Sequence, residues 1–263
     1  MSDNYTMTLA QLEQRVAVLT PPRRYDPFTR QFSRDELFML YETWCPKLSM
    51  SGCEKSHIRY WHHRVVNIEQ GCAGRLAGNI GDAVLRMMVA VATQGPGFRA
   101  LEIGTLFGVN AAATWDIAAT THESARLTII DPLDGYYGAS RHDVATGLRI
   151  TKQTVERNLR TIGVPSDQYR IIQGMSETPG VIEQAANETY NYMFIDGDHS
   201  HEGVLRDWSN YAPMLERGGY VLFDNYKQDS WPEVEKAVDE IIASGEVEYL
   251  GHAWNSAVFR KPV

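Results

Sequence analysis

The chain has 263 residues, of which 43% are hydrophobic and 22% are charged. This balance is typical of a globular protein with enough apolar residues to build a full core. The 33 acidic residues outnumber the 25 basic ones and give a net charge of −8. A general nucleic-acid-binding protein would need a basic surface, so the composition argues against that class.

The cysteines and the hydropathy pattern bear on location. Cys45, Cys53 and Cys72 lack the spacing of a metal site and indicate reduced thiols of an intracellular protein. No apolar stretch reaches membrane-spanning length. The first residues lack a basic region followed by an apolar block, so no secretory signal is expected. We therefore expect a cytoplasmic protein without a membrane partner.

The first part of the chain is helical in pattern. Apolar residues recur at helical spacing as far as Pro21-Pro22, which end the first helix. Ser33, followed by Glu36, predicts the start of a second helix. A long apolar helix is expected from about Gly78 to Thr93. We expect residues 1–77 to form a helical cap or lid segment and residues 78–263 to form one domain.

Beyond residue 97, short apolar runs alternate with helical patterns. Strands are expected at 99–103, 127–131, 169–173, 192–196, 220–224, 247–250 and 257–260, and helices at 110–120, 146–162, 179–188, 202–215 and 231–244. No helix fits between the last two runs, which predicts a hairpin with an antiparallel last strand. The fold class is therefore α/β, with a doubly wound, seven-stranded, mostly parallel sheet.

The first predicted strand leads into a glycine-containing turn. Glu102 is followed by Gly104 and Gly108, and a helix begins near Asn110. The two glycines allow a ligand and the helix to approach the backbone. Glu102 suits a ligand's ammonium group, whereas Asn110 and free N–H groups suit a carboxylate. These residues predict an amino-acid ligand; the alternative is an ordinary turn. Their spacing is not the G-x-G-x-x-G typical of nicotinamide binding.

Acidic residues end three further predicted strands. Asp131 is placed to accept hydrogen bonds from ribose hydroxyls, or it is a turn residue before Pro132. Ribose and amino-acid recognition together predict S-adenosylmethionine. Asp196 and the pair Asp224-Asn225 end neighbouring strands. An incomplete set of hard oxygen ligands suits Mg²⁺, although strand-end acids also cap helices. Whether Asp198 is a further ligand is left open.

From about residue 78 to 263, these segments resemble the class I S-adenosylmethionine-dependent methyltransferases. They are similar to the metal-dependent O-methyltransferases, which include the catechol, caffeoyl-CoA and macrolide-sugar enzymes. The resemblance implies a cofactor site that contains Glu102, Gly104, Thr105, Gly108, Asn110, Asp131, Ser176 and Asp196, with Ser176 beside the adenine. It also implies Mg²⁺ held by Asp196, Asp224 and Asn225.

The resemblance implies that His199, three residues after Asp196, is the catalytic base. The catechol enzymes have lysine there, so histidine favours a sugar-like acceptor. The expected function is Mg²⁺-dependent O-methylation of a small acceptor with neighbouring hydroxyls, preferably a sugar or glycoside. A catechol-like phenol is the alternative, and a non-catalytic cofactor-binding or assembly protein is the rival of another class. Whether residues 132–142 form a lid or a solvated loop, and whether the chain forms a homo-oligomer, stay open.

Overall fold

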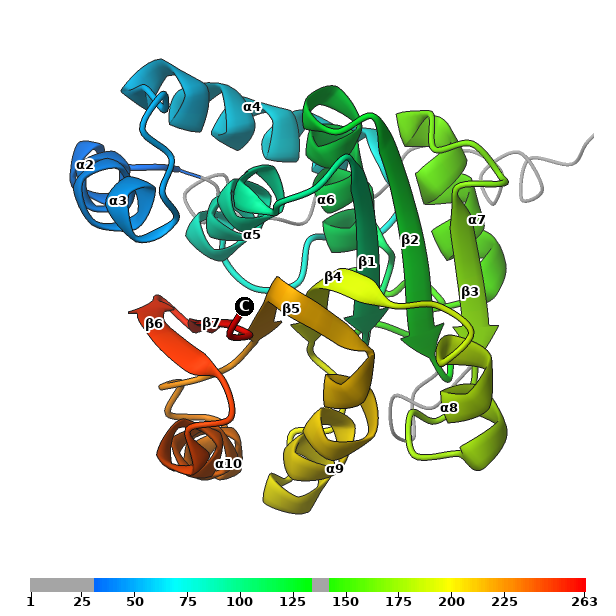
Figure 1. The fold of residues 1–263 in the computed structure, drawn as a ribbon. Helices are drawn as coiled ribbons and strands as arrows, with labels where there is room; N and C mark the ends of the chain where they lie inside the picture. The colour runs from blue at the N-terminus through cyan, green and yellow to red at the C-terminus, as the bar shows by residue number, and fades with distance from the viewer. Residues whose placement is uncertain (1–30, 134–141) are drawn as a thin grey trace, which may run out of the picture.

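The computed structural model describes residues 31–133 and 142–263. At its centre is a seven-stranded sheet with the order β3-β2-β1-β4-β5-β7-β6 (Figure 1). β7 pairs antiparallel with β5 and with β6, whereas the other pairs are parallel. The predicted fold class is confirmed. The strands are β1 Gly97–Ile103, β2 Ser124–Asp131, β3 Tyr169–Gln173, β4 Tyr190–Ile195, β5 Leu215–Phe223, β6 Glu248–Ala253 and β7 Ser256–Arg260.

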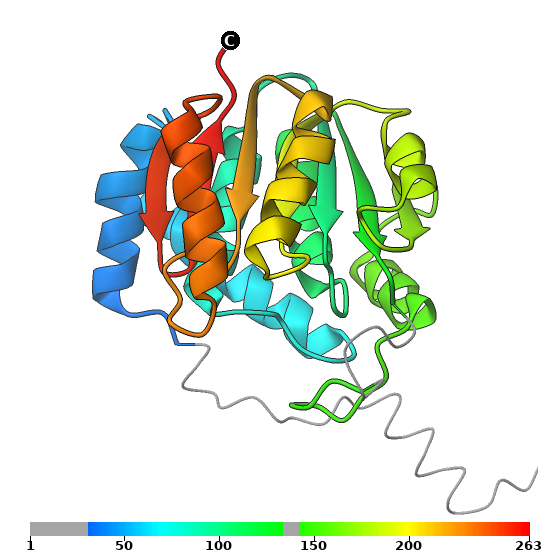
Figure 2. The same cartoon turned by 90° about the horizontal axis from the view of Figure 1, so that it is seen from below.

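Helices cover both faces of the sheet (Figures 1 and 2). One face carries α4 Lys55–Gly71, α5 Ile80–Ala92, α6 Val109–Thr121 and α7 Lys152–Ile162. The other carries α8 Pro179–Ala185, α9 His201–Tyr211 and α10 Pro232–Ser244. Each face of the sheet has its own hydrophobic core, the first beneath α4–α7 and the second beneath α8–α10. Side chains alternate along each strand, so that Phe98 and Ala100 lie in the first core, whereas Leu101 and Ile103 lie in the second. Burial on both faces explains why the strands read as continuous apolar runs.

The helices before α5 belong to the first of these cores. α2 Arg34–Met39 begins with the predicted capping box of Ser33 and Glu36. A π-helical turn, Leu40–Trp44, and α3 Cys45–Lys47 follow, and Trp44 is buried in the same core as α5. The division of the chain at residue 77 stays a prediction. The helix expected before Pro21 lies outside the described residues.

Two helix boundaries differ by four or more residues from those expected. The helix predicted to begin at Thr146 begins at Lys152, because the Thr146 N–H and Oγ1 donate to Asp143 Oδ2 at 2.9 and 2.8 Å and close a turn instead. Thr151 then caps the helix. The helix predicted to reach Leu215 ends at Tyr211, because a 3₁₀ turn that contains Pro213 follows and Leu215 begins β5.

The strand order places a crevice at the centre of the sheet. From β1 the chain proceeds outward to β2 and β3, and from β4 it proceeds the other way to β5. Ligands of open α/β sheets bind outside the carboxyl ends of the strands at such a reversal. The candidate residues that follow β1, β2, β4 and β5 all lie at that end. Among the described residues, no helix combines the length and apolar character needed to cross a membrane.

Candidate active site

The ends of β1 and β4 touch each other at Gly104. This glycine has a φ of 79°, and a Cβ on it would lie 1.8 Å from the carbonyl oxygen of Asp196. The Asp196 N–H donates to the Ile103 carbonyl at 2.8 Å. The close approach that the sequence predicted for a ligand is thus made first by the protein's own backbone. Gly108, with a φ of 72°, precedes α6, and a Cβ there would lie 2.8 Å from Val155 Cγ1.

A hollow opens beside this contact. Segments that follow β1, β2, β3 and β4 line it, and they include Gly104, Asp131, Ser176 and Asp196. Asp131 is 1% exposed, and its two carboxylate oxygens accept N–H groups of Thr105 and Leu133 at 2.7 and 2.8 Å. The structure therefore brings four of the predicted cofactor residues together, and Asp131 also holds two of the loops in place.

The other four predicted cofactor residues, Gly108 among them, lie outside the wall of this hollow. Glu102 is buried, and its Oε1 accepts a hydrogen bond from Thr105 Oγ1 at 2.5 Å. Burial raises the pKa of Glu102 to about 8. Asn110 Oδ1 accepts a hydrogen bond from Arg86 Nη2 at 3.3 Å. Thr105 itself lines a second hollow, and its hydroxyl therefore lies between the buried Glu102 carboxyl and the surface of the site.

That second hollow is a wide groove that continues from the first. The two share Gly104 and residues 196–198. The groove extends over the ends of β4 and β5 and over the start of α10, where its lining includes His199, Asp224, Asn225, Gln228 and Trp231. A molecule in the first hollow and one in the groove would therefore meet at the junction of β1 and β4.

His199, the predicted base, contacts two of the predicted metal ligands. Its Nε2 lies 2.6 Å from Asn225 Oδ1 and 3.4 Å from Asp196 Oδ1. The imidazole stacks on Trp231 with 4.3 Å between ring centroids. Although burial opposes the charged form, the contacts with Asp196 and Asn225 raise the pKa of His199 above its ordinary value.

The third predicted ligand, Asp224, faces a buried arginine that the sequence analysis did not assign to the site. Arg86 Nη1 lies 3.4 Å from Asp224 Oδ1, and the guanidinium lies 4.6 Å from the centre of the Phe194 ring. Burial and the charge of Asp224 together raise the pKa of Asp82 and of Asp196. An arginine within the apolar run 83–92 was the signal for this buried network.

Two further residues of the groove were not predicted. Gln228 Oε1 accepts a hydrogen bond from Asn225 Nδ2 at 2.7 Å, and Trp231 covers His199. Asn225 has a φ of 61°, a left-handed conformation that asparagine tolerates and that often marks functional sites. Gln228 and Trp231 could have been found from the sequence only by their proximity to Asp224, since both lie within seven residues of it.

Other features of the structure bear on the metal prediction without testing it. Within the two described ranges, no three His, Cys, Asp or Glu side chains converge as a metal site. The predicted set consists of two carboxylates and one amide, so the assignment of a metal site stays a prediction.

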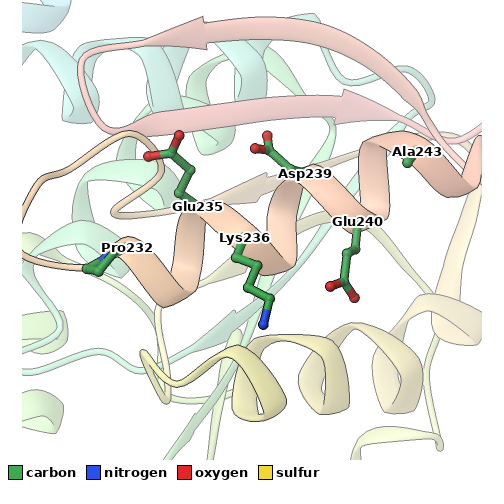
Figure 3. Close-up of a pocket in the computed structure, with 6 residues that line it drawn as sticks. All are labelled: Pro232, Glu235, Lys236, Asp239, Glu240 and Ala243. Atoms are coloured by element: carbon green, nitrogen blue, oxygen red, sulfur yellow. The ribbon is translucent and has the colours of Figure 1, made fainter.

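A further hollow lies along α10, where Figure 3 shows mostly charged side chains. It contains no predicted site residue.

Comparisons with known proteins agree with this arrangement. Residues 101–226 match a family model described as a methyltransferase domain. The O-methyltransferase NovP superposes with a TM-score of 0.52 at 19% identity, over 76% of this chain and 80% of its own. The O-methyltransferase TomG from Streptomyces achromogenes, solved with SAM, gives a TM-score of 0.51 at 12% identity, over 76% and 89%. These structures show the fold.

Two more relatives extend the comparison. A putative O-methyltransferase from Klebsiella pneumoniae superposes with a TM-score of 0.51 at 14% identity, over 89% of this chain and 99% of its own. The uncharacterized protein R132 of Acanthamoeba polyphaga mimivirus is 42% identical over 52 residues, which are 19% of this chain. The match spans 24% of that protein's length. The predicted resemblance, stated from the residues alone, is therefore confirmed.

Proposed function

Because residues 101–226 form a methyltransferase domain on the class I fold, we propose that this chain is a Mg²⁺-dependent O-methyltransferase. Its methyl donor is S-adenosylmethionine, and its acceptor is a hydroxyl of a small molecule with neighbouring oxygens. The observation that carries the proposal is the junction at Gly104 and Asp196, where the two hollows meet and His199 lies beside them. Methyl transfer requires donor and acceptor to be held in line at one point.

The cofactor is assigned to the hollow at the ends of β1–β4. Glu102 serves the ammonium group, since a nearby positive charge stabilises a carboxylate that burial otherwise keeps protonated. Asp131 serves the ribose, because it is a carboxylate at the end of β2 that lines this hollow, where an acid can accept hydrogen bonds from ribose hydroxyls. Ser176 lines the same hollow and is assigned to the adenine.

The charges of the groove fit a divalent cation. The carboxylates of Asp82, Asp196 and Asp224 all lie within electrostatic range of the single Arg86 guanidinium, so acidic side chains outnumber the arginine. Oxygens of Asp196, Asp224 and Asn225 would hold Mg²⁺, which prefers such ligands. When bound, the ion lowers the pKa of an acceptor hydroxyl and orients its oxygens.

His199 can take up the proton of the acceptor hydroxyl. A carboxylate only accepts hydrogen bonds, so the contact with Asp196 Oδ1 places the hydrogen of the neutral imidazole on Nε2. Nδ1 then keeps its lone pair and is the nitrogen that accepts a proton. Asp196 and Asn225 would stabilise the imidazolium that forms, while Trp231 holds the ring in place.

The lining of the groove supports a sugar or glycoside as acceptor. Asn79, Gln228, Ser230 and Asn255 contribute neutral polar side chains, which suit a molecule with several hydroxyls. Trp231 is 41% exposed and offers an aromatic surface at the same place. That surface would also stack on a flat ring, which keeps a catechol-like phenol as the second candidate. A purely cofactor-binding protein would have no need of His199.

The cysteines support a cytoplasmic location for this proposed enzyme. Cys45, Cys53 and Cys72 are all free thiols, as is usual in a reducing compartment. Fractionation of the cells that make the protein tests the location directly.

A methyl-transfer screen tests the proposed function. The full chain is incubated with labelled S-adenosylmethionine and with panels of sugars, glycosides and catechols, in Mg²⁺ and after exhaustive chelation. We expect Mg²⁺-dependent transfer to members of the sugar panels. Transfer confined to catechols would make the phenol reading correct, and full activity of protein shown to be metal-free would refute the metal assignment. Binding of S-adenosylmethionine without transfer to any panel would favour a non-catalytic, cofactor-binding role.

A further inference from the structure

The loop between β5 and α10 contains a short chain of side-chain hydrogen bonds that ends at the active site. His199 Nε2 contacts Asn225 Oδ1 at 2.6 Å, and Asn225 Nδ2 contacts Gln228 Oε1 at 2.7 Å. Asn225 is the proposed ligand whose two side-chain ends differ, since only its oxygen can bind Mg²⁺. Which end faces the groove therefore matters for metal binding.

The direction of this chain follows from one residue that can only accept. His199 Nε2 has two oxygens beside it, Asp196 Oδ1 at 3.4 Å and Asn225 Oδ1 at 2.6 Å, and since a carboxylate can only accept, the hydrogen of the ring is assigned to that nitrogen. The atom of Asn225 that faces Nε2 must then be its oxygen, and its NH₂ group must face Gln228. The Gln228 atom in contact is therefore its carbonyl oxygen. Each amide orientation is fixed by the preceding one.

The backbone of the loop is anchored on two sides, so Gln228 stays where this contact needs it. The Tyr226 N–H donates to the Asn255 carbonyl at 2.9 Å, and the Tyr226 hydroxyl donates to Asp239 Oδ1 at 2.7 Å. Lys227 pairs with Glu235. Figure 3 shows Glu235 and Asp239 on the same side of α10. The Trp231 N–H donates to the Gln228 carbonyl at 2.8 Å, which closes the loop before the helix begins.

We propose that Gln228 is a positioning residue that holds the Asn225 side chain with its oxygen directed toward the metal position. This inference depends on the proposed function, because it assigns Gln228 a role in metal binding through Asn225. Residues that orient metal ligands from behind typically contribute 10- to 100-fold to metal affinity or activity. Gln228 differs from the proposed ligands in that it acts through its acceptor oxygen alone.

Binding of Mn²⁺, a spectroscopic substitute for Mg²⁺, tests the proposal on the full chain with S-adenosylhomocysteine present. Free Mn²⁺ is measured by electron paramagnetic resonance. Gln228→Leu removes the acceptor and should weaken Mn²⁺ binding by about 10- to 100-fold. Gln228→Glu keeps an acceptor oxygen at the same place and should bind Mn²⁺ at least as tightly as the wild type. Gln184→Leu makes the same change on α8, where Gln184 Nε2 donates to the Gly180 carbonyl at 2.9 Å, and should leave Mn²⁺ affinity unaltered.

A double-mutant cycle shows whether Gln228 acts through Asn225. Asn225→Ala removes the ligand itself, so adding Gln228→Leu to it should cause no further loss of Mn²⁺ affinity. An additive loss would contradict the positioning role. So would equal affinities of the wild type and Gln228→Leu, or a parallel loss of S-adenosylhomocysteine affinity, which would indicate general disruption.

Failure of the proposed function gives a different result. If the wild type binds no Mn²⁺ with or without S-adenosylhomocysteine, the metal assignment itself is wrong and the role of Gln228 falls with it. If the wild type binds Mn²⁺ and only the Gln228 variants disagree with expectation, the metal assignment stands and the positioning role alone is overturned.

Discussion

The two hollows that meet at Gly104 differ in how their acidic residues are compensated. On the cofactor side, Asp131 accepts two backbone N–H groups and Glu102 accepts a hydroxyl, all at 2.5–2.8 Å. On the groove side, the contacts of Arg86 are 3.3–3.5 Å long, and among the described residues its Nε and Asp82 Oδ2 are buried without a hydrogen-bond partner. The protein's own backbone completes the first side, whereas the second retains an excess of negative charge that suits a cation.

The largest effect is expected where the two sides touch. Gly104→Ala would place a Cβ 1.8 Å from the Asp196 carbonyl oxygen in a backbone with positive φ. Since backbone must move, we expect a loss of about 3–5 kcal/mol in the free energy of unfolding. Urea unfolding measures it, and both cofactor and Mn²⁺ binding should fall together.

Gly245→Ala is the matched control for that variant. Gly245 also has a positive φ, 69°, but a Cβ there would meet nothing within 4 Å. It should cost only the strain of the left-handed conformation, about 1 kcal/mol. Equal losses in the two variants would mean that the contact between β1 and β4 is not what Gly104 provides.

The next largest effect separates the two sides kinetically. His199→Ala should lower kcat by about 10²–10⁴-fold, the usual contribution of a general base, with S-adenosylmethionine affinity unchanged. Steady-state kinetics on the acceptor found in the screen measures it. His201→Ala serves as the control. His201 lies on α9, its ring contacts Glu240 of α10 at 2.9 Å, and the variant should retain kcat. A near-normal kcat in His199→Ala would assign the base to another residue.

Glu102 offers a test of the cofactor side alone. Burial raises its pKa from 4.5 to about 8, so the folded, ligand-free protein keeps it mostly protonated at pH 7. In the unfolded chain Glu102 ionises at a lower pH, near 4.5, so the free energy of unfolding falls as the pH rises from 4.5 to about 8. Binding of an ammonium group should expel this proton. Calorimetry in buffers with different ionisation enthalpies should detect proton release at pH 7.

Glu102→Gln keeps the shape of the side chain and removes its charge. It should abolish the proton release and weaken S-adenosylhomocysteine binding by about 1.5–3 kcal/mol, while Mn²⁺ affinity stays near that of the wild type. Unchanged proton release would mean that another group titrates on binding. A large fall in Mn²⁺ affinity would show that the two sides are not separable.

The smallest effect concerns stability near the groove. Arg75 binds the Asp143 carboxylate through Nε and Nη2 at 2.9–3.1 Å. Although burial of Asp143 opposes ionisation, Arg75 and Thr146 lower its pKa. Arg75→Met should cost about 1 kcal/mol at pH 7. Because the pKa is lowered in the folded state, this difference should disappear as pH falls below the ordinary aspartate pKa. A difference independent of pH would point to packing instead.

Most of the fold could be predicted because each strand of the sheet is a local apolar run. β3 agrees with its prediction at both ends, and β1 and β2 end where they were expected to end. The errors occur where side chains compete with helix formation. Thr146 reads as a helix start, but its hydroxyl binds Asp143, and that preference depends on where Arg75 holds the carboxylate.

The site could be predicted only as far as it follows strand ends. Asp196 and Asp224 were predicted from their positions at the ends of β4 and β5, and His199 from the resemblance to the metal-dependent O-methyltransferases. Arg86 was not predicted, because its charge within an apolar run indicates a buried network but not the partner, Asp224, which lies 138 positions away in sequence. Gln228 was also missed, since its role depends on which atom of Asn225 it contacts. A local pattern of residues predicts neither the contact between residues far apart in sequence, such as Arg86 and Asp224, nor the orientation of the Asn225 amide.

The position of β7 has a consequence for how the protein is made. Residues 256–260 insert between β5 and β6, which precede them in sequence. During synthesis on the ribosome, β5 therefore has an open edge until β7 has emerged. An open strand edge can pair with other chains, so the nascent protein is prone to aggregation for as long as residues 256–260 are missing. Chaperone demand should accordingly rise when residues 256–260 are deleted.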